Sequence, residues 1–332
     1  MEREYAMTCT ITRTSFYFAA ALCVWTSGAQ AQDFPTRFVT IVAPFQAGGP
    51  SDTVARLIAG PMSKVLGQQV VVENTTGAGG TIGSARVAKA APDGYTLGIS
   101  GSGTHAAVEQ LYASPPYRAL DFESVGLINT APVILVAKKG LAPNTLQEFV
   151  AYLKANEKTV NEGDAGVGSV SHLACSVFKS LIGVKPTVVS YRGTPQVTQD
   201  VIAGNVDYVC NQIVNVVGHV QSGALKAYAV TGSKRSPILP NVPTTAEAGM
   251  PDFKITVWYG LSAPKGTPAP IIAKLNQALS AAMDDPTVVK RFADLGYDVV
   301  PPPQRSAASF DDFMRKEIAL WAKVLGSMKP AN

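Results

Sequence analysis

The chain has 332 residues, of which 46% are hydrophobic and 16% are charged, and its formal net charge is +4. This composition is typical of a compact globular protein and excludes a disordered chain. The sequence has no run of lysine and arginine, which argues against nucleic-acid binding. The mild positive charge slightly favours the approach of an anionic ligand.

The first 31 residues are predicted to be a secretion signal. Arg3 and Arg13 are basic, the apolar run 15–25 follows, and the small residues at 29–31 form a cleavage site of the A-x-A type. The apolar run is shorter than the roughly 20 residues that a transmembrane helix needs. We therefore expect cleavage near Ala31 and an exported product of about 300 residues, which is long enough for two domains.

Strands alternate with helices through the rest of the chain. In the first part the expected strands are 38–44, 69–73 and 95–100, and the expected helices are 51–66 and 81–90. The pattern restarts after a strand at 133–138, with helices expected at 146–155, 171–181, 195–203 and 214–222, and strands at 160–162, 187–190, 206–210 and 224–231. An extended run at 254–263 and helices at 269–283 and 310–325 complete the pattern. Such alternation predicts βαβ units and parallel sheets.

The restart of the pattern predicts an α/β fold with two lobes, each a mainly parallel sheet flanked by helices. Residues 32–132 and 256–332 would form the first lobe, and residues 133–255 the second. The extended segments 133–138 and 254–263 would cross between the lobes. Because these crossings are short, a hinge between the lobes is plausible.

Glycine-rich loops follow the first three expected strands, at residues 45–52, 77–81 and 101–105. Glycine lets the backbone approach a ligand closely, and the free N–H groups at a helix N-terminus favour negative charge. Any one loop is equally well an ordinary turn, but three at the carboxyl ends of one sheet favour an anion site. The candidate ligand-binding residues here are Phe45, Gly48, Gly49, Ser51, Asp52, Gly79, Gly80, Ser102, Thr104 and His105.

Polar residues also follow three strands of the expected second lobe. The candidates are Ser169, Ser171, His172, Arg192 and Asn211. Arg192 would either hold a carboxylate through a bidentate pair or form an ion pair between lobes or at the surface, and the sequence favours neither.

Other kinds of site find little support. Residues 77–83 approximate a dinucleotide-binding fingerprint, but no acidic residue ends the next strand. His105, His172 and His219 are scattered and no cysteine pair has zinc spacing, so we expect neither a metal site nor a cofactor. No G-x-S-x-G elbow is present, and we expect no enzyme activity.

The cysteines allow one bridge. Cys9 and Cys23 lie in the predicted signal, which leaves Cys175 and Cys210 in the exported product. An even pair in an oxidising compartment predicts a disulfide. Two buried free thiols are the alternative. His172 lies one helical turn before Cys175, a spacing that would also allow a thiol–imidazole pair. A disulfide between Cys175 and Cys210 is the stronger interpretation.

The loops together resemble the substrate-binding receptors of tripartite tricarboxylate transporters, the Bug/TctC-like family. The first-lobe segments that carry the resemblance are P-F-x-x-G-G-P-S-D at 44–52, V-E-N-x-x-G-A-G-G at 72–80 and P-D-G-Y-T-L at 92–97. Later matching segments are G-S-x-x-H-L at 168–173, Y-R-G at 191–193, L-P-N-V-P-T at 239–244, E-A-G at 247–249 and A-P-x-G-T-P at 263–268.

The resemblance implies a periplasmic receptor with a type II periplasmic-binding-protein-like fold, which closes on its ligand like a Venus flytrap and delivers it to membrane permease subunits. The ligand would be a di-, tri- or aromatic carboxylate, held at one end by backbone amides, hydroxyls and water of the first lobe and selected by the second. Asn211 is neutral where relatives often carry Asp, which disfavours amino acids. We expect a monomer. The alternative functions are an exported carboxylate sensor and an exported hydrolase that uses the same cleft.

Overall fold

The computed structural model describes residues 34–328, and residues 37–328 belong to one compact unit. The predicted signal and its cleavage site lie outside the described residues. Within residues 34–328, no helix is long and apolar enough to cross a membrane.

The first lobe is built on a mixed sheet. Strand β1 (Val39–Ala43) pairs in parallel with β2 (Val70–Asn74) on one side and β3 (Thr96–Gly101) on the other. Strand β9 (Thr256–Pro264) runs antiparallel between β3 and β4 (Phe122–Lys138), and β10 (Asp298–Val299) pairs with β4. The helices of this lobe are α1 (Pro50–Leu66), α2 (Thr81–Ala88), α3 (Val108–Leu111), α8 (Ala269–Asp284), α9 (Pro286–Asp294) and α10 (Ala307–Met328).

The second lobe repeats the arrangement. Strand β5 (Asn161–Asp164) pairs in parallel with β6 (Thr187–Ser190) and β7 (Tyr208–Gln212), while β7 and β8 (Leu225–Val230) run antiparallel to β4. Its helices are α4 (Leu146–Asn156), α5 (Val170–Ile182), α6 (Thr194–Ala203) and α7 (Ile213–Gln221). Each lobe is thus an α/β layer structure, as the alternation of elements predicts.

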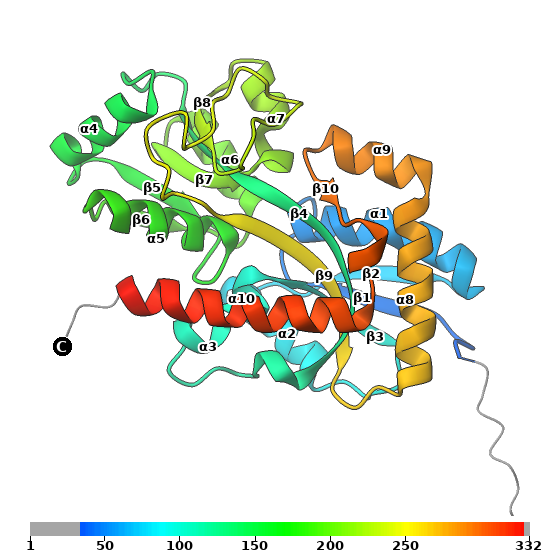
Figure 1. Ribbon diagram of the computed structural model, residues 1–332. Helices are drawn as coiled ribbons and strands as arrows, with labels where there is room; N and C mark the ends of the chain where they lie inside the picture. The colour runs from blue at the N-terminus through cyan, green and yellow to red at the C-terminus, as the bar shows by residue number, and fades with distance from the viewer. Residues whose placement is uncertain (1–33, 329–332) are drawn as a thin grey trace, which may run out of the picture. The chain divides into compact units, whose positions relative to one another are not determined.

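Strand β4 runs through both lobes (Figure 1). Its residues up to Pro132 pair with β9, and its residues from Val133 pair with β7. We propose that the lobes divide here and near residue 255, where β9 begins. The expected strand 133–138 is therefore only the second half of β4. The first half was missed because Gly126, Asn129 and Pro132 interrupt its apolar pattern.

The other differences from the expected elements have local causes. Helix α9 and strand β10 were not expected. Asp285 ends α8 and also caps α9, accepting hydrogen bonds from the backbone N–H groups of Thr287 and Val288. One residue between two helices leaves little signal of a boundary.

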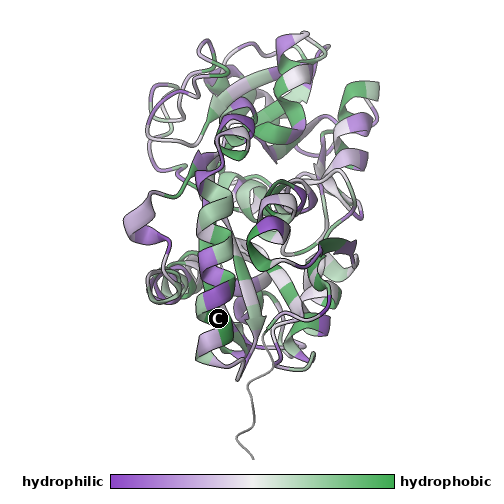
Figure 2. Ribbon diagram, turned by 90° about the vertical axis from the view of Figure 1, so that its right-hand side faces the viewer, coloured by the Kyte–Doolittle hydropathy of each residue, from purple (hydrophilic) through white to green (hydrophobic). Residues whose placement is uncertain are grey.

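Each lobe has a core of its own. In the second lobe, buried aliphatic side chains of β4, α6, β7 and α7 pack together: Ile134, Val136, Val197, Val201, Val209 and Val216. A cluster of the first lobe joins Val42, Val87, Val108, Tyr117 and Phe122. The helices show both hydrophobic and hydrophilic residues (Figure 2), as expected of elements that cover a sheet on one side and face water on the other. The two clusters share no residue.

Candidate functional site

A cavity lies between the lobes, where several helices begin. Its lining comes from both lobes: Phe45, Pro50, Ala165, Ser169, Val170, Ser171, Thr194, Asn211, Gln212 and Tyr259. The volume of this cavity is about 20 Å³. That is enough for about one water molecule. A larger ligand therefore needs the lobes to separate.

The first loop places the start of α1 at this cavity. Gly49 is the N-cap of α1 and Pro50 its first residue, and no side chain caps the helix. The hydroxyl of Ser51, in the first turn, is buried without a hydrogen-bond partner among the described residues. Gly48 has a φ of 78° and donates its backbone N–H to Asp52, so its amide is already occupied.

Asp52 holds the loop in shape instead of pointing a free group at the cavity. Its carboxylate accepts hydrogen bonds from the Gly48 backbone, the Arg56 guanidinium and the Asn74 amide at 2.9–3.0 Å. Burial alone would raise the pKa of Asp52, but these hydrogen bonds, with that from Arg56 the largest, lower it below its usual value. These contacts give Asp52 a role in positioning the loop, while its contact with a ligand stays a prediction.

The second loop lies next to the cavity, where Gly80 approaches the lining residue Phe45. Gly79 and Gly80 have φ values of 61° and 91°, which favour glycine. A Cβ on Gly80 would meet Phe45 and Thr104, and one on Gly79 would overlap the backbone of Val167 in the second lobe. These glycines are needed for close backbone approach, although neither lines the cavity.

The third loop turns its histidine inwards. Ser102 starts a π-helical turn, η2 (Ser102–Ala106), and its hydroxyl is buried without a partner in the described chain. The His105 ring nitrogens lie 3.0 Å from Thr104 Oγ1 and 3.2 Å from Ser100 Oγ, and its ring packs on Phe122. Burial lowers the pKa of His105 to about 3. His105 is therefore a neutral side chain of the first-lobe interior. Neither Thr104 nor His105 lines the cavity, and their contact with a ligand stays a prediction.

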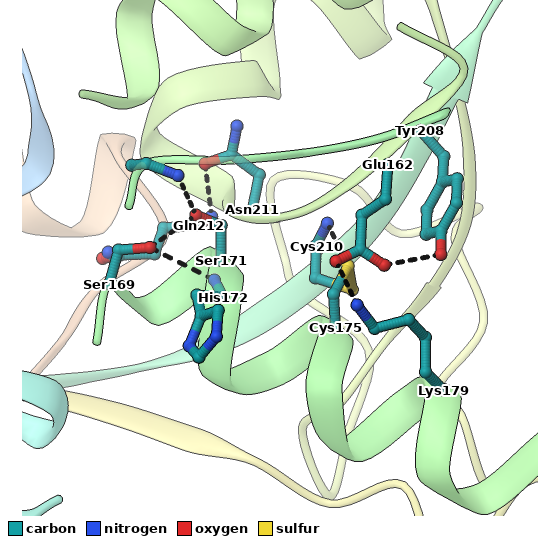
Figure 3. Close-up of a disulfide and its surroundings, with 11 residues drawn as sticks. Glu162, Ser169, Ser171, His172, Cys175, Lys179, Tyr208, Cys210, Asn211 and Gln212 are labelled. Atoms are coloured by element: carbon teal, nitrogen blue, oxygen red, sulfur yellow. Dashed lines mark hydrogen bonds and ion pairs between the residues drawn. A yellow bond between two sulfur atoms is a disulfide. The ribbon is translucent and has the colours of Figure 1, made fainter. Parts of the chain in front are cut away.

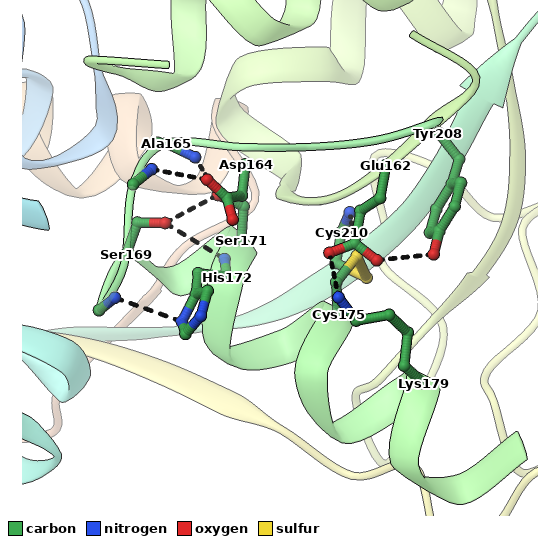
Figure 4. Close-up of polar contacts among 12 residues, drawn as sticks. Glu162, Asp164, Ala165, Ser169, Ser171, His172, Cys175, Lys179, Tyr208 and Cys210 are labelled. Carbon is green, nitrogen blue, oxygen red and sulfur yellow. Dashed lines mark hydrogen bonds and ion pairs between the residues drawn. A yellow bond between two sulfur atoms is a disulfide. The ribbon is translucent and has the colours of Figure 1, made fainter. Parts of the chain in front are cut away.

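In the second lobe, Ser169 and Ser171 stand at the start of α5 and line the cavity (Figure 4). Ser169 caps the helix by accepting a hydrogen bond from the His172 backbone N–H at 3.2 Å, and the two serine hydroxyls lie 3.0 Å apart. The His172 ring does not line the cavity, because its Nδ1 accepts from the Gly168 N–H at 3.3 Å. Burial lowers the pKa of His172, so the ring is a neutral support for the loop.

Asn211 and Gln212 end β7 (Figure 3). Both line the cavity, but only Gln212 has an unused polar atom. Asn211 donates to Thr198 at 3.0 Å and accepts from the Gln212 backbone and from Asn215 at 2.8 Å. Gln212 donates through Nε2 to the Tyr259 hydroxyl at 2.7 Å, and its Oε1 is buried with no partner among residues 34–328. Asn211 thus orders the strand end, and Gln212 offers a free acceptor.

Arg192 lies away from the cavity lining and is exposed. Within the described part of the chain its guanidinium takes part in no hydrogen bond and no ion pair. The structure therefore shows neither an interlobe nor a surface ion pair of Arg192 among residues 34–328, and its contact with a ligand carboxylate stays a prediction.

Three polar residues of the cavity lining were missed from the sequence. Gln212 directly follows a chosen residue, Asn211. Thr194 follows Gly193 and precedes Pro195, a signal for a helix start that would have found it. Tyr259 comes from the distant strand β9, and no local pattern points to it.

The predicted disulfide between Cys175 and Cys210 is confirmed, with Cα atoms 5.4 Å apart (Figure 3). It joins α5 to β7 one residue before Asn211. Beside it, the buried Glu162 carboxylate accepts from Lys179 at 2.8 Å and from the Tyr208 hydroxyl at 2.6 Å. Burial raises the pKa of Glu162 in spite of the Lys179 ammonium. Together these contacts fix α5 against β5 and β7.

The electrostatics of the cavity favour an anion. Helices α1, α5, α6 and α7 all begin at it, and the N-caps Gly49, Gly193 and Gln212 make no side-chain capping bond. Backbone N–H groups of these first turns remain as donors and carry partial positive charge. No acidic side chain is among the lining residues. The described residues also contain no group of three or more His, Cys, Asp and Glu that could hold a metal ion.

Comparison with known proteins agrees with this geometry. The family described as tripartite tricarboxylate transporter family receptor matches residues 54–327. The "UPF0065 protein in the TAR-I ttuE-ttuC′ intergenic region" of Agrobacterium vitis is 46% identical over 90% of this chain and 86% of its own. MatC from Rhodopseudomonas palustris with bound malate is 45% identical, with a TM-score of 0.86 over 88% of this chain and 100% of its own.

A second R. palustris protein, solved with adipate, is 32% identical, with a TM-score of 0.83 over 89% of this chain and 98% of its own. The predicted two-lobe periplasmic-binding-protein fold is thereby confirmed. The chain belongs to the tripartite tricarboxylate transporter family of receptors.

Proposed function

We propose that this protein is an exported, non-catalytic receptor that binds a small dicarboxylate in the cavity between its lobes and delivers it to the permease subunits of a tripartite transporter. The observation that carries the proposal is the convergence of helix N-termini from both lobes on one cavity that no acidic side chain lines. Two such sets of donors, on opposite walls, suit a ligand with a carboxylate at each end.

The polar atoms that line the cavity, together with the buried Ser51 hydroxyl next to it, suggest how the ligand is oriented. The first turn of α1 would hold one carboxylate, with Ser51 as a hydroxyl donor, and the first turns of α5 and α6 would hold the other, with Ser169 and Thr194. Burial raises the pKa of Tyr259, so its hydroxyl stays protonated and can donate as well. The free Oε1 of Gln212 would accept from a ligand hydroxyl or a bridging water.

Likeness to relatives supports the ligand class and the transport role. One structural neighbour holds malate and another holds adipate, both small dicarboxylates. The family name and the predicted signal at residues 1–31 support delivery from the periplasm to a transporter. The proposal therefore includes permease subunits as partners.

Calorimetric titration with malate, succinate and adipate tests the proposal. We expect one ligand per chain for at least one of these acids, and no binding of its dimethyl ester, because the ester lacks the charge that the helix N-termini stabilise. The Thr194→Val variant should weaken binding about 3- to 10-fold, since it removes one hydroxyl donor to a charged group.

Thr187→Val is the matched control, because Thr187 is exposed on β6 and away from the cavity. It should bind as the wild type does. Absence of binding for every acid, or equal binding of acid and ester, would rule out the proposed function.

A further inference from the structure

The rim of the cleft carries a contact between the lobes that is separate from the cavity. The loop 166–168 of the second lobe lies against the backbone of Gly79 and Gly103 in the first. A Cβ on Gly103 would overlap the carbonyl oxygen of Gly168, and a Cβ on Gly79 would overlap that of Val167. The two lobes therefore meet backbone to backbone, with no room for a methyl group.

Tyr112 adds a hydrogen bond at the same place. Its hydroxyl lies 3.1 Å from the carbonyl oxygen of Ala78, in its own lobe, and 3.2 Å from that of Val167, in the other lobe. One phenolic proton is thus shared between two acceptors. The hydrogen bond to Ala78 already orients the Tyr112 hydroxyl within the first lobe. The hydroxyl can therefore donate to the carbonyl oxygen of Val167 when the lobes come together.

These residues do not belong to the cavity wall. Tyr112, Gly103 and Val167 are absent from its lining, so their effect on a ligand must pass through the position of the lobes. Gly103 also differs from Gly79, because its φ is not in the region reserved for glycine. An alanine at 103 therefore fits the first lobe by itself and clashes only when the lobes are closed.

We propose that Tyr112 and the glycine contact of Gly103 with Gly168 form a latch that holds the closed cleft and sets how long the ligand is retained. This proposal rests on the proposed receptor function. The latch stabilises only the closed form, so its loss speeds release and leaves the first encounter with the open form unchanged. Tyr112 is a positioning residue, since it acts on the ligand through the second lobe.

Stopped-flow fluorescence with malate or adipate, whichever binds the wild type, measures association and dissociation separately. Tyr112→Phe keeps the ring and removes the hydrogen bond, so dissociation should be about 3- to 10-fold faster with little change in association. Gly103→Ala should have a larger effect on apparent affinity, because the tight-binding closed form is barely populated. Melting temperatures should stay close to the wild-type value in both variants.

Gly60→Ala is the control, because a Cβ at Gly60 has nothing within 4 Å and the residue is exposed in the body of α1. It should release ligand at the wild-type rate. Wild-type dissociation rates in both Tyr112→Phe and Gly103→Ala would overturn the latch while leaving the receptor function intact.

A second measurement decides the matter if no acid binds. Nitroxide labels on Lys89→Cys and Lys185→Cys, exposed positions in the first and second lobes, report the distance between lobes by pulsed dipolar spectroscopy. The latch predicts that Gly103→Ala shifts the distribution to longer distances in the ligand-free protein. Identical distributions with and without Gly103→Ala would overturn it, independently of any ligand.

Discussion

At the residue scale, Asp52 is an acidic side chain within a loop that we propose binds a ligand carboxylate. Its carboxylate lies 2.9 Å from Arg56 Nη2 and is bonded to the Gly48 N–H and the Asn74 amide. The charge is thus compensated within the first lobe, and the loop is held in the conformation that presents the start of α1. The sequence pattern G-G-P-S-D identified the loop correctly, but it did not separate the residue that shapes the loop from those that face the cavity.

Replacing Asp52 by Asn should destabilise the fold by about 1–3 kcal/mol at neutral pH, because several hydrogen bonds to a buried charge are weakened. The pKa of Asp52 is lower in the folded protein than its usual value of 3.8. Its contribution is therefore present above the usual value and lost as the pH falls through the lower, folded value. Urea denaturation of both proteins at neutral pH and at about pH 3 measures the difference.

Asp252→Asn is the matched control for this prediction. Asp252 is exposed, and its side chain has no hydrogen bond or ion pair among the described residues. The control should remain within about 0.5 kcal/mol of the wild type. A loss in Asp52→Asn that is equal at both pH values would contradict the role assigned to the charge.

At the scale of elements, the disulfide joins the two elements of the second lobe that reach the cavity. Cys175 lies in α5, which begins at Ser169, and Cys210 lies in β7, which ends at Gln212. Sequence alone supported the bridge through the number of cysteines and the expected compartment. What it could not supply was the spatial relation of α5 and β7, because 35 positions separate the two cysteines.

The double variant Cys175→Ala, Cys210→Ala should lose about 3–4 kcal/mol of unfolding free energy, the amount that chain entropy predicts for a loop of this length. Both side chains are fully buried, so the small cavities left by alanine add to the loss. Denaturant unfolding of the variant and of the oxidised wild type measures the difference. A loss below about 1 kcal/mol would mean that Glu162, Lys179 and Tyr208 hold α5 to β7 without the bridge.

The order of the helices and strands was largely predictable from the sequence, but the pairing of the strands was not. Helices α1, α4 and α5 begin and end within one residue of the expected ranges 51–66, 146–155 and 171–181. Strands β4 and β9 were expected to cross between the lobes, but their antiparallel pairing and the full length of β4 depend on contacts distant in sequence. The predicted parallel character therefore holds only within the βαβ parts of each lobe.

At the scale of the whole molecule, the same limit applies to the cavity. Each lobe presents its strand ends and helix starts to the other, which the repeated pattern of loops predicted. Which side chains face inward depends on hydrogen bonds that close within a lobe, such as those that occupy Asn211 and His172. Tyr259 reaches the cavity because β9 crosses the sheet beside β4, a relation that no local motif encodes.

A crystal structure of the protein with bound malate, or with adipate if that acid binds more tightly, tests the central claim most directly. We predict one dicarboxylate between the lobes, with one carboxylate against the first turn of α1 near Ser51 and the other against the first turns of α5 and α6 near Ser169 and Thr194. A ligand bound outside this cavity, or one whose carboxylates face away from these helix N-termini, would contradict the account.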